Sequence, residues 1–450
     1  MNIIDNDLLS IQESRILVEE AVRAQKELAK FSQKQLDVIV DRVSEELGKY
    51  ARELAVTSCE ETEYGNVEDK YLKNRFVCEY LPKKLKDMKC VGVISEDLQK
   101  KTKDIGVPLG VIAAFPPATS PVSTTIYKVL LAIKSGNAII ISPHPRAKNV
   151  TMRVAELIRS TARKHGIPEG SISYLHTTSF EGAKALMEHK LVDLIMITGV
   201  PDLKEAAYRC GKPVLYSGAG NGPVFIERTA DIEKAVRDII TSKTFDNGVV
   251  MAAEQAIVVD GCIESLTVKE LERQGAYFMN DEERTKLLKI LTLENGLKNP
   301  EIVGKTAKVL AKMAGFFVPE YTKLLIVRNG YVSQEKVFNQ TLLCPIISFY
   351  VEKNWREACE KCIELLLGEK RGHTLTIHSK DEEVIEQFSL KKPVDRILVN
   401  TPATLGGMGA TTNLFPSMTL LGGVYAYGMN TDNISPLNLI YIRKVSYGVR

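Results

Sequence analysis

The sequence predicts an α/β protein with parallel sheets and two domains, and three observations support this fold class. The chain has 450 residues, which at about 150 residues per domain is enough for two or three domains. Its first 90 residues or so have the apolar spacing of helices, and from about residue 105 short apolar runs alternate with amphipathic helices. The alternation begins again after about residue 225. Apolar strands joined by helices of this length favour parallel sheets that are covered on both faces.

In chain order, the helical start is clearest over residues 31–57, where apolar residues recur every three or four positions. Helices are then predicted over 124–136 and 149–166, each ending at a glycine. Continuous apolar runs predict the strands of the first α/β half at 110–115, 137–142, 171–176, 192–198, 212–217 and 222–227. Those of the second half are predicted at 256–260, 323–327, 346–352, 374–379 and 396–400.

Composition excludes several classes of protein. The formal net charge is +3, and lysine and arginine are interspersed with acidic residues, so no nucleic-acid partner is expected. The first 25 residues contain early carboxylates and no unbroken apolar stretch, which predicts neither a signal peptide nor a membrane span and favours a cytoplasmic location. The eight cysteines show no disulfide framework, and Cys359 and Cys362 fit a helix rather than a metal site. No metal is expected.

Glycine-rich turns after predicted strands mark the expected ligand cleft between the two halves. The Gly-x-Gly-x-x-Gly fingerprint of dinucleotide-binding proteins is absent. The turns TGVPDL, with Gly199, and SGAGNGP, with Gly218 and Gly220, are the nearest equivalents. Asp202 makes the first turn unfavourable to phosphate. Two histidines, His144 and His373, adjoin predicted strands, although backbone bonding is the commoner role for a lone histidine.

Several longer motifs together resemble the CoA-acylating aldehyde dehydrogenases, especially the aldehyde half of bifunctional aldehyde/alcohol dehydrogenases and their single-domain relatives. The motifs run from about residue 15 to the C-terminus and are NVEDKYLKN, GVISED, IIISPHPRAKN, GKPVLYSGAGNGPVFI, SKTFDNGVVMAAEQ, RGHT and LVNTPATLGGMG. The resemblance implies an aldehyde dehydrogenase-like α/β fold with two Rossmann-type domains and a β bridging element. It also implies NAD(P) as cofactor and coenzyme A as co-substrate, with an aldehyde or an acyl-CoA as the small-molecule substrate.

In that family a cysteine thiolate attacks the aldehyde, a hydride passes to the nicotinamide, and coenzyme A accepts the acyl group. This chemistry needs sulfur as a strong nucleophile and amide donors for the developing oxyanion. The motif that carries the cysteine resembles FDNGVVM here, with Met251 in the cysteine position. A thioether has no proton to lose and cannot form the covalent intermediates. The resemblance therefore predicts that the usual reaction is absent or severely weakened.

Other departures fall in the same pocket. Ser120 stands where the family has an asparagine that holds the oxyanion, and losing such a donor costs on the order of a hundredfold in rate. Thr341 stands where the family has a glutamate that holds the nicotinamide ribose, and Val200 replaces the second glycine of a TGG motif. Tyr425 and Tyr427 enter a loop that is rich in glycine in the family.

Other parts of the cofactor path match the resemblance. The adenosine side of the pocket is matched by Ser142, His144 and Arg146. The path of the cofactor is matched by Gly199, Gly218 and Gly220, and the catalytic region by His373. The implied nucleotide-binding domain comprises residues 1–90 and 107–222, and the catalytic domain comprises 223–430. Residues 91–106 and 431–450 form the bridging element, whose strand edges an oligomer would cover. At least a homodimer is expected.

Two further readings of the sequence stay open. The chain is also consistent with a non-catalytic pseudoenzyme that acts as a structural or regulatory partner of an active homologue. Alternatively, catalysis persists by direct hydride transfer without a covalent intermediate, or with Cys344 as a relocated nucleophile. The commoner role for a cysteine in such a turn is that of a small buried residue.

Overall fold

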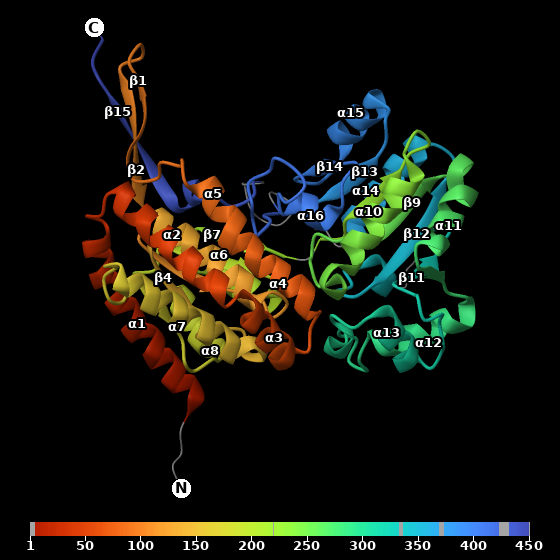
Figure 1. Ribbon diagram of the computed structural model, residues 1–450, viewed down its shortest axis with the longest axis horizontal. Coiled ribbons are helices and arrows are strands. Elements are labelled where there is room, and N and C mark those ends of the chain that lie inside the picture. Colours follow the sequence, from red (N-terminus) through yellow and green to blue (C-terminus); the bar gives the residue numbers. More distant parts are fainter. Residues whose placement is uncertain (1–4, 219, 333–335, 369–372, 423–431, 450) are drawn as a thin grey trace.

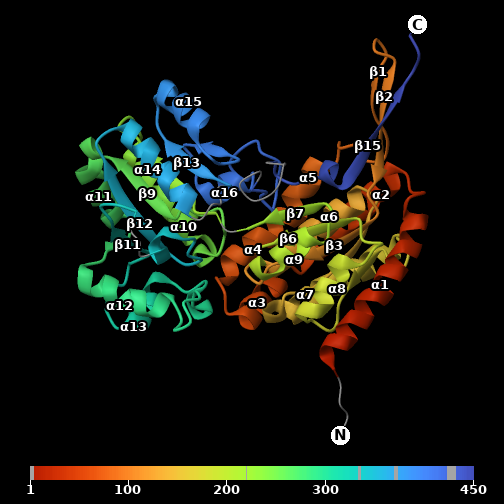
Figure 2. The same ribbon diagram turned by 180° about the vertical axis from the view of Figure 1, so that it is seen from behind.

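Three sheets organise the molecule (Figures 1 and 2). The structure is a computed structural model, and it describes residues 5–218, 220–332, 336–368, 373–422 and 432–449. Two of the sheets are parallel throughout, and the third is small and antiparallel. The predicted α/β class with two parallel sheets is confirmed. Tyr425 and Tyr427 lie outside the described residues.

The first parallel sheet has five strands in the order β5-β4-β3-β6-β7. Its strands are continuous apolar runs, and β3, β4, β5 and β6 are buried along their whole length. Such burial is expected where helices cover both faces of a parallel sheet. The strands are β3 (Val111–Phe115), β4 (Ala138–Ile141), β5 (Ile172–Tyr174), β6 (Leu194–Thr198) and β7 (Val214–Ser217).

Helices cover both faces of this sheet (Figure 1). The helices of one face share a core with alternate residues of β3, and the helices of the other face pack on the remaining ones. The first group is α1 (Asn6–Leu28), α8 (Phe180–Glu188) and α9 (Lys204–Arg209). The second group is α2 (Gln33–Lys49), α3 (Ala51–Thr62), α5 (Leu81–Leu85), α6 (Pro121–Lys134) and α7 (Lys148–Lys164), with α4 (Val67–Arg75) and a π-helical turn (Phe76–Tyr80) beside them.

The second parallel sheet has seven strands in the order β10-β11-β12-β9-β8-β13-β14. Sequence patterns predicted all of them except β10, an edge strand of which only Ala276 is buried. The prediction that the strand at 222–227 belongs to the first half is wrong, because β8 pairs with β9 and β13 of the second sheet. The strands are β8 (Pro223–Ile226), β9 (Ala256–Asp260), β10 (Ala276–Phe278), β11 (Leu324–Arg328), β12 (Ile346–Glu352), β13 (Leu375–His378) and β14 (Ile397–Val399).

Three apolar clusters bury the faces of the second sheet. Cys359 and Cys362 belong to one of them, on α14, so both thiols are packing residues of a helix. The helices are α10 (Ile232–Thr244), α11 (Glu264–Arg273), α12 (Asp281–Leu291), α13 (Ala307–Ala314), α14 (Trp355–Gly368), α15 (Glu382–Lys391) and α16 (Ala403–Gly407). Short 3-10 turns occupy Pro145–Ala147, Pro201–Leu203, Phe245–Gly248, Gly261–Ile263, Pro300–Ile302, Lys336–Asn339 and Pro436–Leu439.

The antiparallel sheet projects from the body of the molecule beside the C-terminus (Figure 2). Its order is β1-β2-β15, from β1 (Gly92–Asp97), β2 (Thr102–Pro108) and β15 (Ile440–Ser446). The C-terminal segment therefore pairs with residues more than 300 positions earlier in the chain. Much of β1 and β15 is exposed, in contrast to the strands of the parallel sheets.

Helix α6 matters most for the site, because its N-terminus lies at the boundary between the two halves. All 14 of its residues are buried, and Pro121 begins it at a position where no backbone N–H is needed. Within the described chain, no helix combines the length and the apolar character needed to cross a membrane.

Candidate active site

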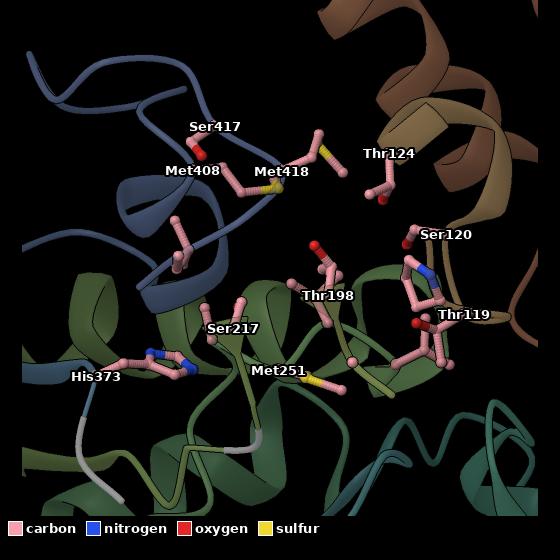
Figure 3. A pocket seen from close by; sticks show the side chains of 16 residues that line it. Thr119, Ser120, Thr124, Thr198, Ser217, Met251, His373, Met408, Ser417 and Met418 are labelled. Carbon is pink, nitrogen blue, oxygen red and sulfur yellow. The ribbon is translucent and has the colours of Figure 1, made fainter. Parts of the chain in front are cut away.

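A narrow pocket lies at the carboxyl ends of the first sheet's strands, where the two halves of the molecule meet. Residues at or just after the ends of β3, β6 and β7 line one part of it, and the segments around 249–252 and 408–420 of the second half close it. Crevices at this edge of a parallel sheet are the usual ligand sites of α/β proteins. Figure 3 shows Thr119 and Ser120 on one side, His373 on the opposite side, and Met251 between them.

Met251 follows a turn whose backbone is held in an unusual conformation. Asp246 and Asn247 both have left-handed backbone angles, with φ of 50° and 54°, a conformation that aspartate and asparagine tolerate better than most residues. Gly248 also has a positive φ of 78°, and a side chain there would meet the backbone of Cys344. The FDNG motif thus fixes the direction in which Met251 leaves the turn.

The side chain of Met251 packs against Gly199. A Cβ atom at Gly199 would lie 2.8 Å from Met251 Cε and 3.1 Å from Pro117 Cβ. Gly199 also has a left-handed φ of 65°, so both space and backbone require glycine. Gly199 therefore belongs to the wall that holds the thioether in the pocket.

Two buried lysines of α4 pair with one buried carboxylate of the FDNG turn. Lys70 Nζ lies 3.0 Å and Lys73 Nζ 2.5 Å from the same oxygen, Asp246 Oδ2. Burial by itself raises the pKa of Asp246, but the two ammonium groups hold that pKa below its ordinary value. The backbone N–H of Asn66 donates to the other carboxylate oxygen at 2.8 Å. These contacts fasten the turn before Met251 to the first half of the molecule.

Ser120 connects this cluster to the pocket. Lys73 Nζ donates to Ser120 Oγ at 2.6 Å, and Lys70 Nζ donates to the carbonyl of Thr119 at 2.8 Å. Ser120 is the residue before α6, yet its side chain makes no capping bond to the helix. Thr124, one turn further along α6, is 1% exposed and lines the same pocket, and its Oγ1 has no partner within the described chain.

His373 forms the opposite wall. Gly220 makes room for it, because a Cβ atom there would lie 2.5 Å from His373 Nε2. His373 Nδ1 shares a hydrogen bond of 2.8 Å with Thr374 Oγ1. Burial and the nearby charge of Arg396 lower the pKa of His373 to about 3, against a smaller raising effect of the Met251 backbone. The imidazole is therefore neutral at physiological pH.

A second, roomier cavity of about 280 Å³ adjoins the first along the same sheet edge. Ser142 and His144 line it, as do Val200 and Asp202 from the turn after β6. Burial lowers the pKa of His144 below its ordinary value, although Asp202 opposes this shift. The structure thus brings two of the three residues expected at the adenosine side into one cavity.

Arg146, the third residue expected at the adenosine side, is not among the described residues that line that cavity. Its guanidinium stacks 4.6 Å from the ring centre of Tyr64 and donates to the Tyr64 hydroxyl at 2.9 Å. It also forms an ion pair of 3.1 Å with Glu301 in the second half. In this structure Arg146 joins the two halves.

Three other residues that the sequence analysis named as candidates do not line the narrow pocket: Thr341, Gly218 and Cys344. Thr341 is buried, and its carbonyl accepts a hydrogen bond from Lys298 Nζ. Gly218 leaves space for the ring of Tyr216, which a Cβ atom would approach to 2.6 Å. Cys344 is fully buried, and burial raises the pKa of its thiol to about 12. A thiol in that state is a poor nucleophile, which speaks against relocation of catalysis to Cys344.

Sequence reasoning missed Lys73, Thr124 and Glu254. Lys73 belongs to the motif NVEDKYLKN, but its spacing from the FDNG turn gave no sign of contact. Glu254 is buried behind the Met251 segment, and burial raises the pKa of its carboxyl to about 7. No group of three or more histidine, cysteine or acidic side chains suited to a metal ion occurs in the described parts of the chain.

Comparison with known proteins gives the family. The profile of the "Aldehyde dehydrogenase family" matches residues 8–284. The succinate-semialdehyde dehydrogenase (acetylating) of Clostridium kluyveri is 33% identical over 431 residues, which cover 96% of this chain and 95% of that protein. The chain belongs to the aldehyde dehydrogenase family. Its relatives place it in the CoA-acylating branch of that family.

Other relatives agree with this aldehyde dehydrogenase assignment. The bifunctional aldehyde-alcohol dehydrogenase of Escherichia coli K12 is 38% identical over 442 residues, which are 97% of this chain and 50% of that protein. The chain thus spans about half the length of the bifunctional relatives. An acetylating aldehyde dehydrogenase structure from Geobacillus thermoglucosidasius has 43% identity and a TM-score of 0.96, covering 100% of this chain and 99% of that one.

Two solved structures of this aldehyde dehydrogenase fold hold ligands, each at 26% identity and covering 96% of this chain. The first is an engineered glycolyl-CoA reductase with bound NADP+, which has a TM-score of 0.86; the match covers 96% of that protein's chain. A Rhodopseudomonas palustris propionaldehyde dehydrogenase has a TM-score of 0.87, is covered to 97%, and contains bound CoA and an acylated cysteine.

Proposed function

We propose that this protein is a CoA-acylating aldehyde dehydrogenase by descent that keeps the cofactor cleft but no longer performs the covalent oxidation of an aldehyde. The observation that carries the proposal is Met251 in the narrow pocket, where the family resemblance expects a cysteine. A thioether cannot become an anion, and a sulfur that already has two carbon substituents cannot release an acyl group to coenzyme A.

The other pocket residues support this proposal. Ser120 stands in place of an asparagine donor, and its oxygen accepts a hydrogen bond from Lys73. The only pocket imidazole among the described lining residues, His373, is neutral and bonded to Thr374. No thiol lines the pocket in the described part of the chain. A thiohemiacetal therefore has no atom on which to form.

Binding of NAD(P) and coenzyme A is the retained part of the proposed function. NAD(P), when bound, supplies a hydride acceptor or donor. The cavity of about 280 Å³ beside Ser142 and His144 is large enough for the adenosine end of such a ligand, and solved relatives hold NADP+ and CoA. His144 offers a neutral ring, and Ser142 a hydroxyl, for hydrogen bonds to it.

The experiment titrates NADH, NADPH and coenzyme A into the purified protein and follows nicotinamide fluorescence and calorimetric heat. Binding of at least one ligand at micromolar to millimolar concentration, without thioester formation from acetaldehyde and coenzyme A, is expected. Failure of all three ligands at millimolar concentration would refute the cofactor cleft. Thioester formation at ordinary enzymatic rates, of about 1 per second or more, would refute the loss of covalent oxidation.

A partner role beside an active homologue is the second candidate, and the antiparallel sheet favours it. β15 presents Tyr441 and Ile442 with 61% and 48% of their surface exposed. Exposed apolar strand surface of this kind is usually covered by another chain. Co-purification of a catalytically active family member with the tagged protein from its own cells would support this role, and recovery of a homo-oligomer alone would count against it.

A further inference from the structure

Ser120 of the narrow pocket is in direct contact with a buried lysine, and the oxidation of an aldehyde by a cysteine thiolate uses neither residue as a reacting group. Lys73 Nζ lies 2.6 Å from Ser120 Oγ. Lys73 is only 2% exposed, whereas Ser120 lines the pocket beside Met251. A serine hydroxyl is a weak nucleophile until a neighbouring base removes its proton, and lysine fills that role in several unrelated hydrolases.

The charges and the burial around Lys73 favour the loss of a proton from its ammonium group. Lys70 and Lys73 share one oxygen of one carboxylate, Asp246, which compensates a single positive charge. Burial lowers the pKa of Lys73 to about 8, even though Asp246 opposes the shift and Lys70 adds to it. Asp69 on α4 and Cys59 on α3 are the other titratable groups close enough to interact with the cluster. A lysine in this range can exchange a proton near neutral pH.

Polar groups for a developing oxyanion are present at the same place. Ser120 makes no capping bond, so the first amides of α6 have no side-chain acceptor from it. The N-terminus of a helix of this length favours negative charge. Thr124 Oγ1 lies one turn along the same helix, buried and without a partner in the described chain. A buried hydroxyl without a partner at the wall of a pocket is a donor available to a ligand.

We propose that Ser120 is a nucleophile and Lys73 its general base, and that the pocket hydrolyses an activated short-chain acyl ester or thioester. The proposal goes beyond the loss of aldehyde oxidation and does not require NAD(P). The space in the pocket is about 50 Å³, and Met408, Met418 and Leu420 make its far wall apolar. That space suits an acyl group of two or three carbons rather than a long chain.

The steps balance without any redox partner. Neutral Lys73 takes the proton of Ser120 Oγ as this oxygen bonds to the acyl carbon. The tetrahedral intermediate then expels the alcohol or thiol, which receives the proton from Lys73 Nζ. In the second half, Lys73 accepts a proton from water as the water oxygen attacks the acyl-serine, and returns it to Ser120 Oγ. The sum is acyl ester or thioester plus water, giving carboxylic acid plus alcohol or thiol.

The test uses the full chain with two probes, p-nitrophenyl acetate and acetyl-CoA, which present the same acyl group on different leaving groups. Release of p-nitrophenolate or of the free thiol is measured, and an acetylated intermediate is sought by mass spectrometry of the peptide that contains Ser120. Hydrolysis with an acetyl group on Ser120, abolished by Ser120→Ala, is expected. Hydrolysis of the ester alone would assign the site to esters, and hydrolysis of both would extend it to thioesters.

Lys73→Arg separates the base from the structural ion pair. Arginine keeps the positive charge beside Asp246 but cannot act as a base, so a loss of about a hundredfold or more in kcat is expected with little change in unfolding temperature. The wild-type rate should rise with pH through about 8, and the Lys73→Arg variant should lack this rise. Lys134→Met is the matched control, because Lys134 is equally buried and paired at 2.6 Å with Asp37 far from the pocket.

Three results would overturn the proposal: no hydrolysis of either probe above background, full activity of Ser120→Ala, or an acetyl adduct on another residue only. Wild-type rates in Lys73→Arg would remove Lys73 as the base. None of these outcomes affects the titrations of NADH and coenzyme A, so failure of this site and failure of the cofactor cleft are distinguishable.

Discussion

Met251 is the residue on which the proposed loss of covalent chemistry depends, because its sulfur already has two carbon substituents. Its methyl group packs at the wall formed by Gly199 and Pro117. The neighbouring donors depart from the family as well, since Ser120 replaces an amide that could hold an oxyanion. The proposed loss of covalent aldehyde oxidation therefore involves two positions of one pocket, 251 and 120, and restoring one of them should restore little activity.

Restoration is predicted to need both positions. Met251→Cys alone should give at most slow acyl-CoA reduction, because the thiolate would lack the amide donor. Met251→Cys combined with Ser120→Asn should be about a hundredfold faster. NADH consumption with acetyl-CoA measures both variants, with Met251→Ala as the control that lacks a thiol. Full turnover of the single variant would show that Ser120 is an adequate donor.

Asp246 is predicted to be a major source of stability, because its carboxylate pairs directly with two buried ammonium groups. Asp246→Asn leaves Lys70 and Lys73 buried without their carboxylate, so a loss of about 3–5 kcal/mol in the free energy of unfolding is expected. Urea denaturation measures it. Glu27→Gln, which removes an exposed pair with Lys30, is the control and should change stability by less than about 0.5 kcal/mol.

The same carboxylate predicts a pH dependence. The folded protein holds the pKa of Asp246 below its ordinary value, whereas the unfolded chain has the ordinary value. Its contribution is therefore complete above the ordinary pKa and is lost as the pH falls through the lower pKa of the folded state. In wild type, stability should fall on acidification below about pH 4, and this part of the fall should be missing in Asp246→Asn.

Among the elements, the turns at the ends of strands decide the geometry of the pocket. The turn after β6 contributes Gly199, and the FDNG turn contributes Met251, so contact between the two turns joins the two halves. Helix α6 contributes Ser120 and Thr124 from its N-terminus. Each element is local in sequence, but the pocket exists only where three of them meet.

Contact between the two turns is predicted to be measurable by a double-mutant cycle. Gly199→Ala should destabilise the protein by about 1–3 kcal/mol, because the new Cβ meets Met251 Cε and the backbone is left-handed. Met251→Ala should relieve the steric part and leave the backbone part. A coupling energy of at least about 0.5 kcal/mol is expected from urea denaturation of the four proteins. Strictly additive effects would show that the two side chains do not compete for space.

For the whole molecule, the two halves are held together by side chains as well as by the chain itself. The Lys70 and Lys73 pairs with Asp246 are buried, and the Arg146 contacts with Tyr64 and Glu301 lie nearer the surface. The antiparallel sheet is the part of the described molecule that projects most clearly from this body (Figure 1). Its exposed strands are the surface on which we expect another chain of this fold, a second copy or an active homologue, to pack.

Oligomerisation through this sheet is predicted to depend on β15. Ile442→Lys, alone or with Tyr441→Lys, should convert an oligomer into monomers, because burying a charged ammonium against an apolar strand is unfavourable. Light scattering coupled to size-exclusion chromatography measures the mass. Phe317→Lys is the control, since Phe317 is 92% exposed and lies away from the sheet. A wild-type chain that is monomeric at high micromolar concentration would contradict the expectation.

The sequence by itself determined the local structure and the family, and it carries the prediction that the nucleophile is missing. Short continuous apolar runs predicted the buried strands because helices cover both faces of each sheet. The strand β10 was missed; it is an edge strand, and only one of its residues is buried. The motifs were sufficient to indicate the family, and the identity of residue 251 was sufficient to predict a lost nucleophile, because that depends on one atom type.

Only the tertiary structure decided which side chains act together. Lys73 and Ser120 are separated by 47 positions, and Lys73 and Asp246 by 173, so no periodicity connects them. Arg146 stacks on Tyr64 outside the adenosine-side cavity and pairs with Glu301 of the second half. Cys344 lies in an apolar cluster within the second half. Contacts of this kind depend on how strand-end turns from two sheets face each other, which is a property of the folded chain and not of any segment of it.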